Sequence, residues 1–284
     1  MNEERGNISI MSSLNRNSKG GQKMDDNTKR KLIRNYFKPF PKWTTWMILI
    51  GVVIFFIGIL ATAVMAIIGV AIMGLGVLGI VLSSKGKPTD SQMEEFLEED
   101  KKKLAEKAIK KLGIDESELV GDVIYLPPGL IFQGWDEARA IRDNTHLPPH
   151  ALKVGKDKIL RFGAFQYQAF FPTDKFLGSF GCVWDFCSGE SANEQTEEFF
   201  YKDVVSVTTK TEDRIISNPK TRSPIKISDW ETFRLSVSRG ESISVILRSE
   251  QFLKKFIKEA ADIPTTTAEK AIQTVRTILR EKKA

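Results

Sequence analysis

The fold of this chain is decided by the apolar stretch Trp46–Leu82, which reads WMILIGVVIFFIGILATAVMAIIGVAIMGLGVLGIVL. Its 37 residues carry no charge, and Thr62 is the only conventionally polar side chain among them. As one helix the stretch would be about 55 Å long, whereas the hydrocarbon core of a bilayer is about 30 Å thick. Two helices of roughly 18 residues each would match that thickness. The stretch therefore predicts a two-helix transmembrane hairpin, with spans at about 46–63 and 66–82 and a turn near Ala63–Ala66.

Basic residues flank the apolar stretch on both sides. Lys and Arg close to a span are retained in the cytoplasm, so the flanks place both ends of the chain in that compartment. Two ends on one side require an even number of crossings, which independently favours two spans over one. Aromatic rings at the start of the first span are expected at the level of the headgroups. The residues predicted to lie at the membrane surface are Lys29, Arg30, Lys31, Arg34, Lys38, Lys42, Trp43, Trp46, Lys85 and Lys87.

Residues 1–87 and 88–284 differ in charge. The first part holds 12 Lys and Arg and 4 Asp and Glu, a net charge of +8, and the second holds 30 and 32, a net charge of −2. A nucleic-acid-binding protein needs a basic face on its folded domain, so we expect no nucleic-acid partner. The basic flank is explained either by anionic lipid headgroups or by its role in setting the topology.

The N-terminal region divides into two segments. Residues 1–26 have almost no large apolar side chains and are predicted to form a disordered N-terminus. Residues 27–43 form a basic juxtamembrane segment that contains an amphipathic helix at 27–38. Two prolines end this helix before the first span. The apolar side of the helix is formed by Leu32, Ile33, Tyr36 and Phe37.

Small residues recur at heptad spacing within the predicted hairpin segment, 44–84. A spacing of seven keeps them on one helix face, so that two backbones can approach closely in lipid. They predict packing of the two spans against each other or, as the alternative, association between subunits. The apolar stretch contains no ionisable group that could carry a proton or an ion. The predicted helix-packing residues are Gly51, Gly58, Gly69 and Gly76.

A charged helix follows the apolar stretch, within the segment 88–113. Thr89 and Gln92 form a capping box, and Gly113 marks the end of the helix. The early residues are acidic and the late ones basic, which complements the helix dipole. Its apolar stripe is thin, with Met93, Leu97, Leu104, Ala108 and Leu112. We expect a solvated stalk helix that lies on the hairpin or projects from it.

An irregular connector, 114–157, leads to a β domain at 158–284. The connector is predicted to contain one short strand near 123–126 and a helical turn near 135–141. There the apolar period changes to two, which predicts antiparallel strands at about 160–171, 176–186, 199–209, 233–237 and 243–247, and a weaker strand within 213–228. Two helices, at about 249–262 and 267–282, close the chain. The predicted fold class is therefore α+β, in which a cytoplasmic antiparallel sandwich or small barrel follows a membrane hairpin.

Three runs of sequence follow one another in the β domain. They are FFYKDVVSV at 199–207, FRLSV at 233–237 and, after Gly240, SISV at 242–245. In this order, before a terminal amphipathic helix, they resemble the PH-like domains found in bacterial membrane proteins of uncharacterised role. The resemblance covers less than half of the chain and transfers no site residue. It implies a bent sandwich closed by a C-terminal helix, a binding scaffold for lipid headgroups or peptides, and a bacterial inner membrane. The stretch Asn218–Asp229 is longer than a simple hairpin needs.

The chain shows no pattern typical of an enzyme, a cofactor site or a metal site. Cys182 and Cys187 lie five residues apart on a predicted strand, so their side chains point to opposite faces and are expected to be ordinary buried or half-buried thiols. His146 and His150 have the spacing of metal ligands on a helix, but two prolines between them forbid that helix. We therefore expect no catalysis, no cofactor and no metal.

Two functions fit these features. The first is a membrane-anchored scaffold, whose β domain recruits a protein, a peptide or an anionic lipid to the inner face of the membrane. The second is a self-associating protein, a homo-oligomer whose glycine-faced hairpins remodel or permeabilise the bilayer while the β domain acts as a sensor. We favour the first.

Overall fold

The computed structural model of the chain describes residues 24–38, 41–128, 152–217, 224–238, 240, 242–251, 254 and 265–283. Some predictions fall outside these residues. They concern most of the N-terminal segment 1–26, the helical turn at 135–141, the two histidines and most of the helix at 249–262.

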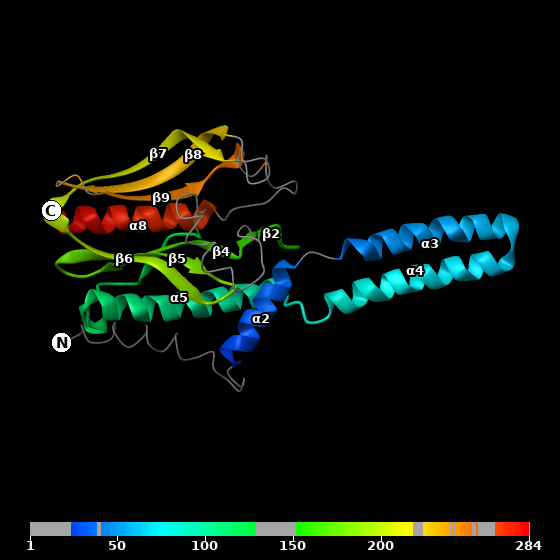
Figure 1. Cartoon of the computed structure of the whole chain (residues 1–284). Coiled ribbons are helices and arrows are strands. Elements are labelled where there is room, and N and C mark those ends of the chain that lie inside the picture. The colour runs from blue at the N-terminus through cyan, green and yellow to red at the C-terminus, as the bar shows by residue number, and fades with distance from the viewer. Residues whose placement is uncertain are drawn as a thin grey trace.

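Two apolar helices, α3 (Lys42–Ala61) and α4 (Ala63–Ser84), extend side by side from one end of the molecule (Figure 1). Both are long and apolar enough to cross a membrane. The break between them is one residue, Thr62, whose backbone is extended (φ −154°, ψ 144°). The turn therefore lies just before the predicted one, since all of Ala63–Ala66 is helical. A β-branched residue such as Thr favours the extended backbone, which suits it to this position.

Helix α2 (Asp26–Phe37) precedes the apolar pair and α5 (Asp90–Leu112) follows it. The predicted capping box of α5 is present, and Gly113 ends the helix in the left-handed conformation with φ of 64°. The structure corrects the prediction of a solvated stalk, because α5 lies along a β-sheet with one side buried. Its apolar stripe is wider than predicted and consists of Met93, Phe96, Leu104, Ala105, Ala108 and Leu112.

The strands form two open antiparallel sheets and one small hairpin. The first sheet has the order β1-β4-β5-β6, the second has the order β7-β8-β9, and β2 pairs with β3. Two 3₁₀ turns, η1 (Glu116–Glu118) and η2 (Tyr201–Asp203), and the helix α8 (Thr265–Lys283) complete the described elements. The strands are β1 (Ile124–Tyr125), β2 (Leu152–Val154), β3 (Leu160–Phe162), β4 (Ala164–Pro172), β5 (Phe176–Asp185), β6 (Glu190–Phe200), β7 (Val204–Ser217), β8 (Pro224–Val237) and β9 (Ser242–Arg248).

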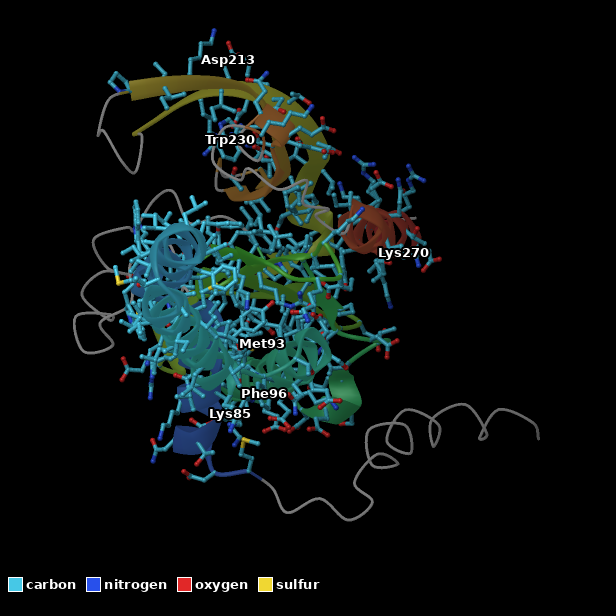
Figure 2. The ribbon with its side chains drawn as sticks, turned by 90° about the vertical axis from the view of Figure 1, so that its right-hand side faces the viewer. Lys85, Met93, Phe96, Asp213, Trp230 and Lys270 are labelled. Carbon is cyan, nitrogen blue, oxygen red and sulfur yellow. The ribbon has the colours of Figure 1, made fainter. Side chains whose placement is uncertain are left out.

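Apolar cores lie on both faces of the first sheet, and the one that contains α2 and α5 also includes Ile227 and Trp230 of β8. Phe180, Cys182 and Trp184 of β5 face α2 and α5, whereas Leu177 faces the second sheet and α8. Figure 1 shows α8 between the two sheets. Figure 2 shows Met93 and Phe96 on α5, below the strands, while Trp230 lies on the inner side of the curved second sheet and Asp213 on its outer side. The period-two alternation predicted for β5 is thus confirmed.

Several strand predictions need correction. Strand β6 was not predicted, and the expected strand at 199–209 is split by η2 into the end of β6 and the start of β7. Most side chains of β6 are exposed and polar, so the strand has no apolar period. The insertion-like stretch Asn218–Asp229 is in part regular, because Pro224–Asp229 belongs to β8 and Pro224 pairs with Ser217. The α+β class is confirmed. The described strands form two open sheets and not a closed barrel.

Candidate functional site between the apolar helices and the domain

A buried carboxylate joins α2 to α5. Asp100, in the middle of α5, is 0% exposed. Its oxygens accept hydrogen bonds from Lys29 Nζ at 2.9 Å and from Arg30 Nη1 and Nη2 at 2.5 and 3.0 Å. Trp184 Nε1 on β5 donates a further bond at 3.1 Å. Three elements thus meet at one side chain, which we name the Asp100 cluster (Lys29, Arg30, Asp100 and Trp184).

Contacts other than ion pairs also stabilise the Asp100 cluster. The guanidinium of Arg30 lies 5.5 Å from the ring centre of Trp184 and donates to the carbonyl oxygen of Phe186 at 3.2 Å. Lys29 also pairs with Glu99, which is largely exposed, at 2.7 Å. Burial alone would lower the pKa of Arg30, but the hydrogen bonds and charges of Asp100 and Asp26 together outweigh burial and raise it. Lys29 and Arg30 are thus paired with Asp100 inside the protein, and proteins tolerate buried charges only when they are paired.

This cluster corrects the predicted role of two residues. Lys29 and Arg30 were expected at the membrane surface, but they are 2% and 4% exposed and point into the protein. Arg34 donates to the carbonyl oxygen of Cys187 at 3.1 Å, which ties α2 to the turn after β5 as well. The apolar side of α2 likewise faces the domain, since Ile33 and Tyr36 are fully buried. Of the predicted surface residues, those exposed in the structure are Lys31, Lys38, Lys42, Trp43, Trp46 and Lys85.

A second set of contacts lies where α2 ends and α5 begins. Tyr36 Oη donates to Asp90 at 2.7 Å, and the backbone N–H of Lys156, in the β2–β3 turn, donates to the same carboxylate at 2.7 Å. Lys153 Nζ on β2 donates to the carbonyl oxygen of Tyr36 at 3.1 Å. Burial raises the pKa of Asp90, but the bonds from Tyr36 and Lys156 together with the charge of Arg161 outweigh it, and the net shift is downward. The hairpin β2–β3 is therefore fastened to both helices that lead to α3 and α4.

The two chain segments that enter and leave the apolar helices also touch each other. Lys87, after α4, donates through Nζ to the carbonyl oxygen of Lys38, before α3, at 2.8 Å. Together with the Asp100 cluster, this contact joins both ends of the α3–α4 pair to one folded domain.

The four glycines predicted to pack helices lie at the contact between α3 and α4. A Cβ added to Gly51 would lie 2.8 Å from the carbonyl oxygen of Gly69, and one added to Gly76 would lie 2.7 Å from Ile48 Cγ1. A Cβ on Gly58 would overlap the backbone of Ala66. Gly74 differs from them, because nothing lies within 4 Å of its added Cβ. The heptad glycines thus serve a contact within one chain.

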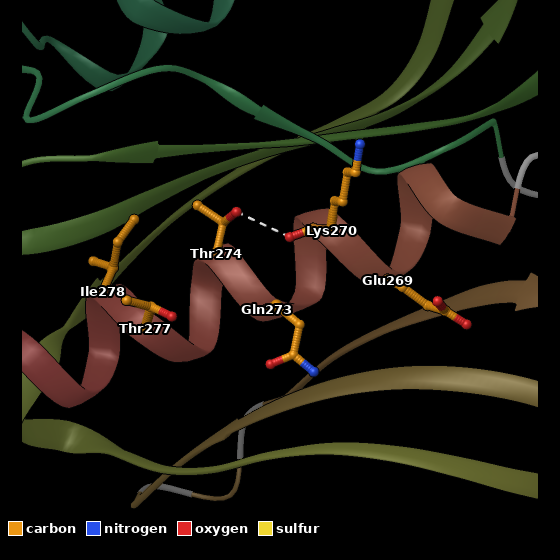
Figure 3. A pocket seen from close by; sticks show the side chains of 6 residues that line it. All are labelled: Glu269, Lys270, Gln273, Thr274, Thr277 and Ile278. Atoms are coloured by element: carbon orange, nitrogen blue, oxygen red, sulfur yellow. Dashed lines mark hydrogen bonds between the residues drawn. The ribbon is translucent and has the colours of Figure 1, made fainter.

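Open depressions lie at two places among the described residues of the β domain. The first, of about 610 Å³, runs along the exposed side of α8 (Figure 3). Thr274 Oγ1 there donates to the carbonyl oxygen of Lys270 at 2.9 Å. The second, of about 430 Å³, lies where β6, η2 and the end of β8 meet. The α8 depression is lined by Glu269, Lys270, Gln273, Thr274, Thr277 and Ile278.

The described residues contain no group of three or more His, Cys, Asp and Glu side chains placed to hold a metal ion. Cys182 and Cys187 are both buried, and burial raises the pKa of Cys182 to about 12. A thiol with so high a pKa is almost wholly protonated at neutral pH and is a poor nucleophile.

No protein-family model, no curated protein and no solved structure matches this chain. Its function must therefore be argued from the contacts described above.

Proposed function

We propose that this protein is a membrane-anchored binding module. In this proposal α3 and α4 both cross a bacterial inner membrane, and the β domain, a PH-like scaffold without catalytic activity, lies on the cytoplasmic side. The domain recruits a protein, a peptide or an anionic lipid to the inner face of the membrane. The self-association alternative has less support, because the glycines that suggested it already serve the contact between α3 and α4.

The observation that carries this proposal is the double attachment of the domain to the apolar helices. A domain held by one flexible linker would sample many orientations, whereas α2 and α5 are joined by the buried Asp100 cluster. A fixed domain meets a partner at the membrane surface with its orientation already set, which lowers the entropic cost of binding. Anchoring also raises the effective concentration of the domain at the surface, so weak contacts suffice.

The exposed depression on α8 is the surface we assign to the partner. Thr274 and Thr277 line this depression, and a double substitution of both by Arg should fill it without changing the buried side of α8. We expect affinity capture of the full-length protein from solubilised membranes to recover a partner that the Thr274→Arg/Thr277→Arg variant loses at least tenfold. The matched control is Glu106→Arg on the exposed side of α5, which should retain the partner.

Both proteins and co-purified lipids are quantified in that capture. Recovery of no protein and no anionic lipid above a tag-only control would contradict recruitment. Equal recovery by the wild type and the α8 variant would contradict the assignment of the partner to α8.

A further inference from the structure

Basic side chains from two separate parts of the chain meet at the end of the domain nearest to the apolar helices. Lys87 follows α4, and Lys153 and Lys156 come from the β2–β3 hairpin, 66 and 69 residues further along the chain. Figure 1 shows β2 beside the end of α2, where the chain leads into α3. We name these three residues the lysine collar. Sequence reasoning missed the contribution of the hairpin, because nothing in its local pattern places it beside α2.

The lysine collar is built on ordered contacts. The ammonium of Lys153 lies 3.6 Å from the ring centre of Tyr36, in addition to its bond to the carbonyl oxygen of that residue. The position of Lys156 is set by its backbone bond to Asp90. Lys87 is oriented by its bond to the carbonyl oxygen of Lys38. A neutral carbonyl oxygen and an aromatic face thus orient the ammonium of Lys153 without cancelling its charge.

The carboxylates near the lysine collar bond to groups other than the ammoniums of Lys153 and Lys156. Asp157 bonds Arg161 at 2.6 Å, Glu94 lies 3.6 Å from the same guanidinium, and Asp90 accepts from Tyr36. Among the described residues, no carboxylate lies within 4.0 Å of the ammonium of Lys153 or Lys156. The pKa of Lys153 is lowered by burial and by the charges of Lys87, Arg161 and Lys156, against the opposing effect of Asp90. The site thus has an excess of positive charge that an anion would relieve.

The position of the lysine collar relative to the ends of α3 and α4 indicates which anion it binds. Lys87 lies three residues after the end of α4, and Lys38 lies four residues before the start of α3. Trp43 and Trp46, in the first turns of α3, are 54% and 64% exposed, as is typical of rings at the headgroup level. A helix that ends at the hydrocarbon boundary places the next few residues among the phosphates.

We propose that the lysine collar binds the phosphate of an anionic phospholipid in the leaflet that faces the domain. This inference rests on the proposed membrane anchoring and names a ligand for it. The headgroup phosphate would lie between the β2–β3 hairpin and the end of α4, so that the lipid itself fastens the domain to the bilayer.

The test uses the full chain reconstituted in nanodiscs of phosphatidylcholine with an increasing fraction of phosphatidylglycerol. The midpoint of thermal unfolding reports binding, since a ligand of the folded state raises it. We expect phosphatidylglycerol to raise the midpoint of the wild type at low ionic strength. The Lys153→Gln/Lys156→Gln variant should require about 30-fold more of that lipid for the same shift, because two charges are removed. The matched control Lys210→Gln/Lys254→Gln, with exposed lysines of the β domain, should behave as the wild type.

Two further arms complete the experiment. Lys153→Arg/Lys156→Arg retains the charge and should restore the response to phosphatidylglycerol, which separates loss of the site from loss of folding. Inorganic phosphate added to pure phosphatidylcholine discs should give no shift. An undiminished response of the Gln variant, or an equal shift with inorganic phosphate, would overturn the lipid site. Failure of the wild type to enter nanodiscs at all would instead overturn the proposed anchoring.

Discussion

The Asp100→Asn variant should lose about 3–5 kcal/mol of the free energy of unfolding, because the substitution removes the buried counter-charge that Lys29 and Arg30 share. Lys29 and Arg30 are almost fully buried, and Asp100 is the only buried carboxylate that both contact among the described residues. Asn keeps the shape of the side chain and one acceptor oxygen, so the loss reports charge and not volume. We further expect α2 to detach from α5 before the β-sheets unfold.

The matched control for that variant is Glu99→Gln. Glu99 also pairs with Lys29, but its side chain is 60% exposed, so its removal should cost at most about 1 kcal/mol. Both variants are compared with the wild type by thermal melting of the full chain in one detergent, followed by limited proteolysis at the α2 end. Equal destabilisation by the two substitutions would show that the Asp100 cluster does not join α2 to the domain.

Gly58→Leu is expected to separate α3 from α4. An added Cβ at this position overlaps the backbone of Ala66, and backbone atoms cannot move aside as a flexible side chain can. Overpacking costs roughly 1–3 kcal/mol when neighbouring side chains can adjust, so this substitution should lie at or above the upper end of that range. We expect a lower midpoint of thermal aggregation in detergent and a lower level of protein in the membrane.

Gly74→Leu provides the control, because it adds the same side chain to α4 where nothing lies within 4 Å. It should melt as the wild type does. If Gly58→Leu and Gly74→Leu behaved alike, the contact between α3 and α4 would not depend on close approach at the glycines.

The sequence predicts well where one signal acts locally. The uncharged stretch of 37 residues is one local signal, so the two apolar helices are predicted with bounds two to four residues from those observed. The predicted turn, Ala63–Ala66, begins one residue after the observed break at Thr62. The capping box of α5 involves two residues that are three apart in the sequence, and the end of the helix depends on the backbone conformation of Gly113 alone. Both signals are therefore local. The alternation along β5 is apparent because each face of that strand meets a different apolar core.

The remaining features depend on contacts between distant residues. Lys29 and Arg30 resemble other basic residues of the flank, and only the position of Asp100, 70 residues further on, shows that they are buried. Strand β6 has few apolar side chains because most of it faces solvent at the edge of the sheet, so it has no period to detect. Lys153 belongs to a short hairpin whose place beside α2 is set by tertiary packing.

The most direct test of the account is the topology of α3 and α4 in intact cells. Single cysteines are introduced at Thr62, in the turn between the helices, and at Glu106, on the exposed side of α5. The parent chain, whose Cys182 and Cys187 are buried, gives the background. With a membrane-impermeant thiol reagent, we expect the Thr62→Cys variant to react in intact cells and the Glu106→Cys variant to react only after permeabilisation. Labelling of the Glu106→Cys variant in intact cells, or protection of the Thr62→Cys variant from the external reagent, would contradict a domain fastened to the inner face by two membrane-crossing helices.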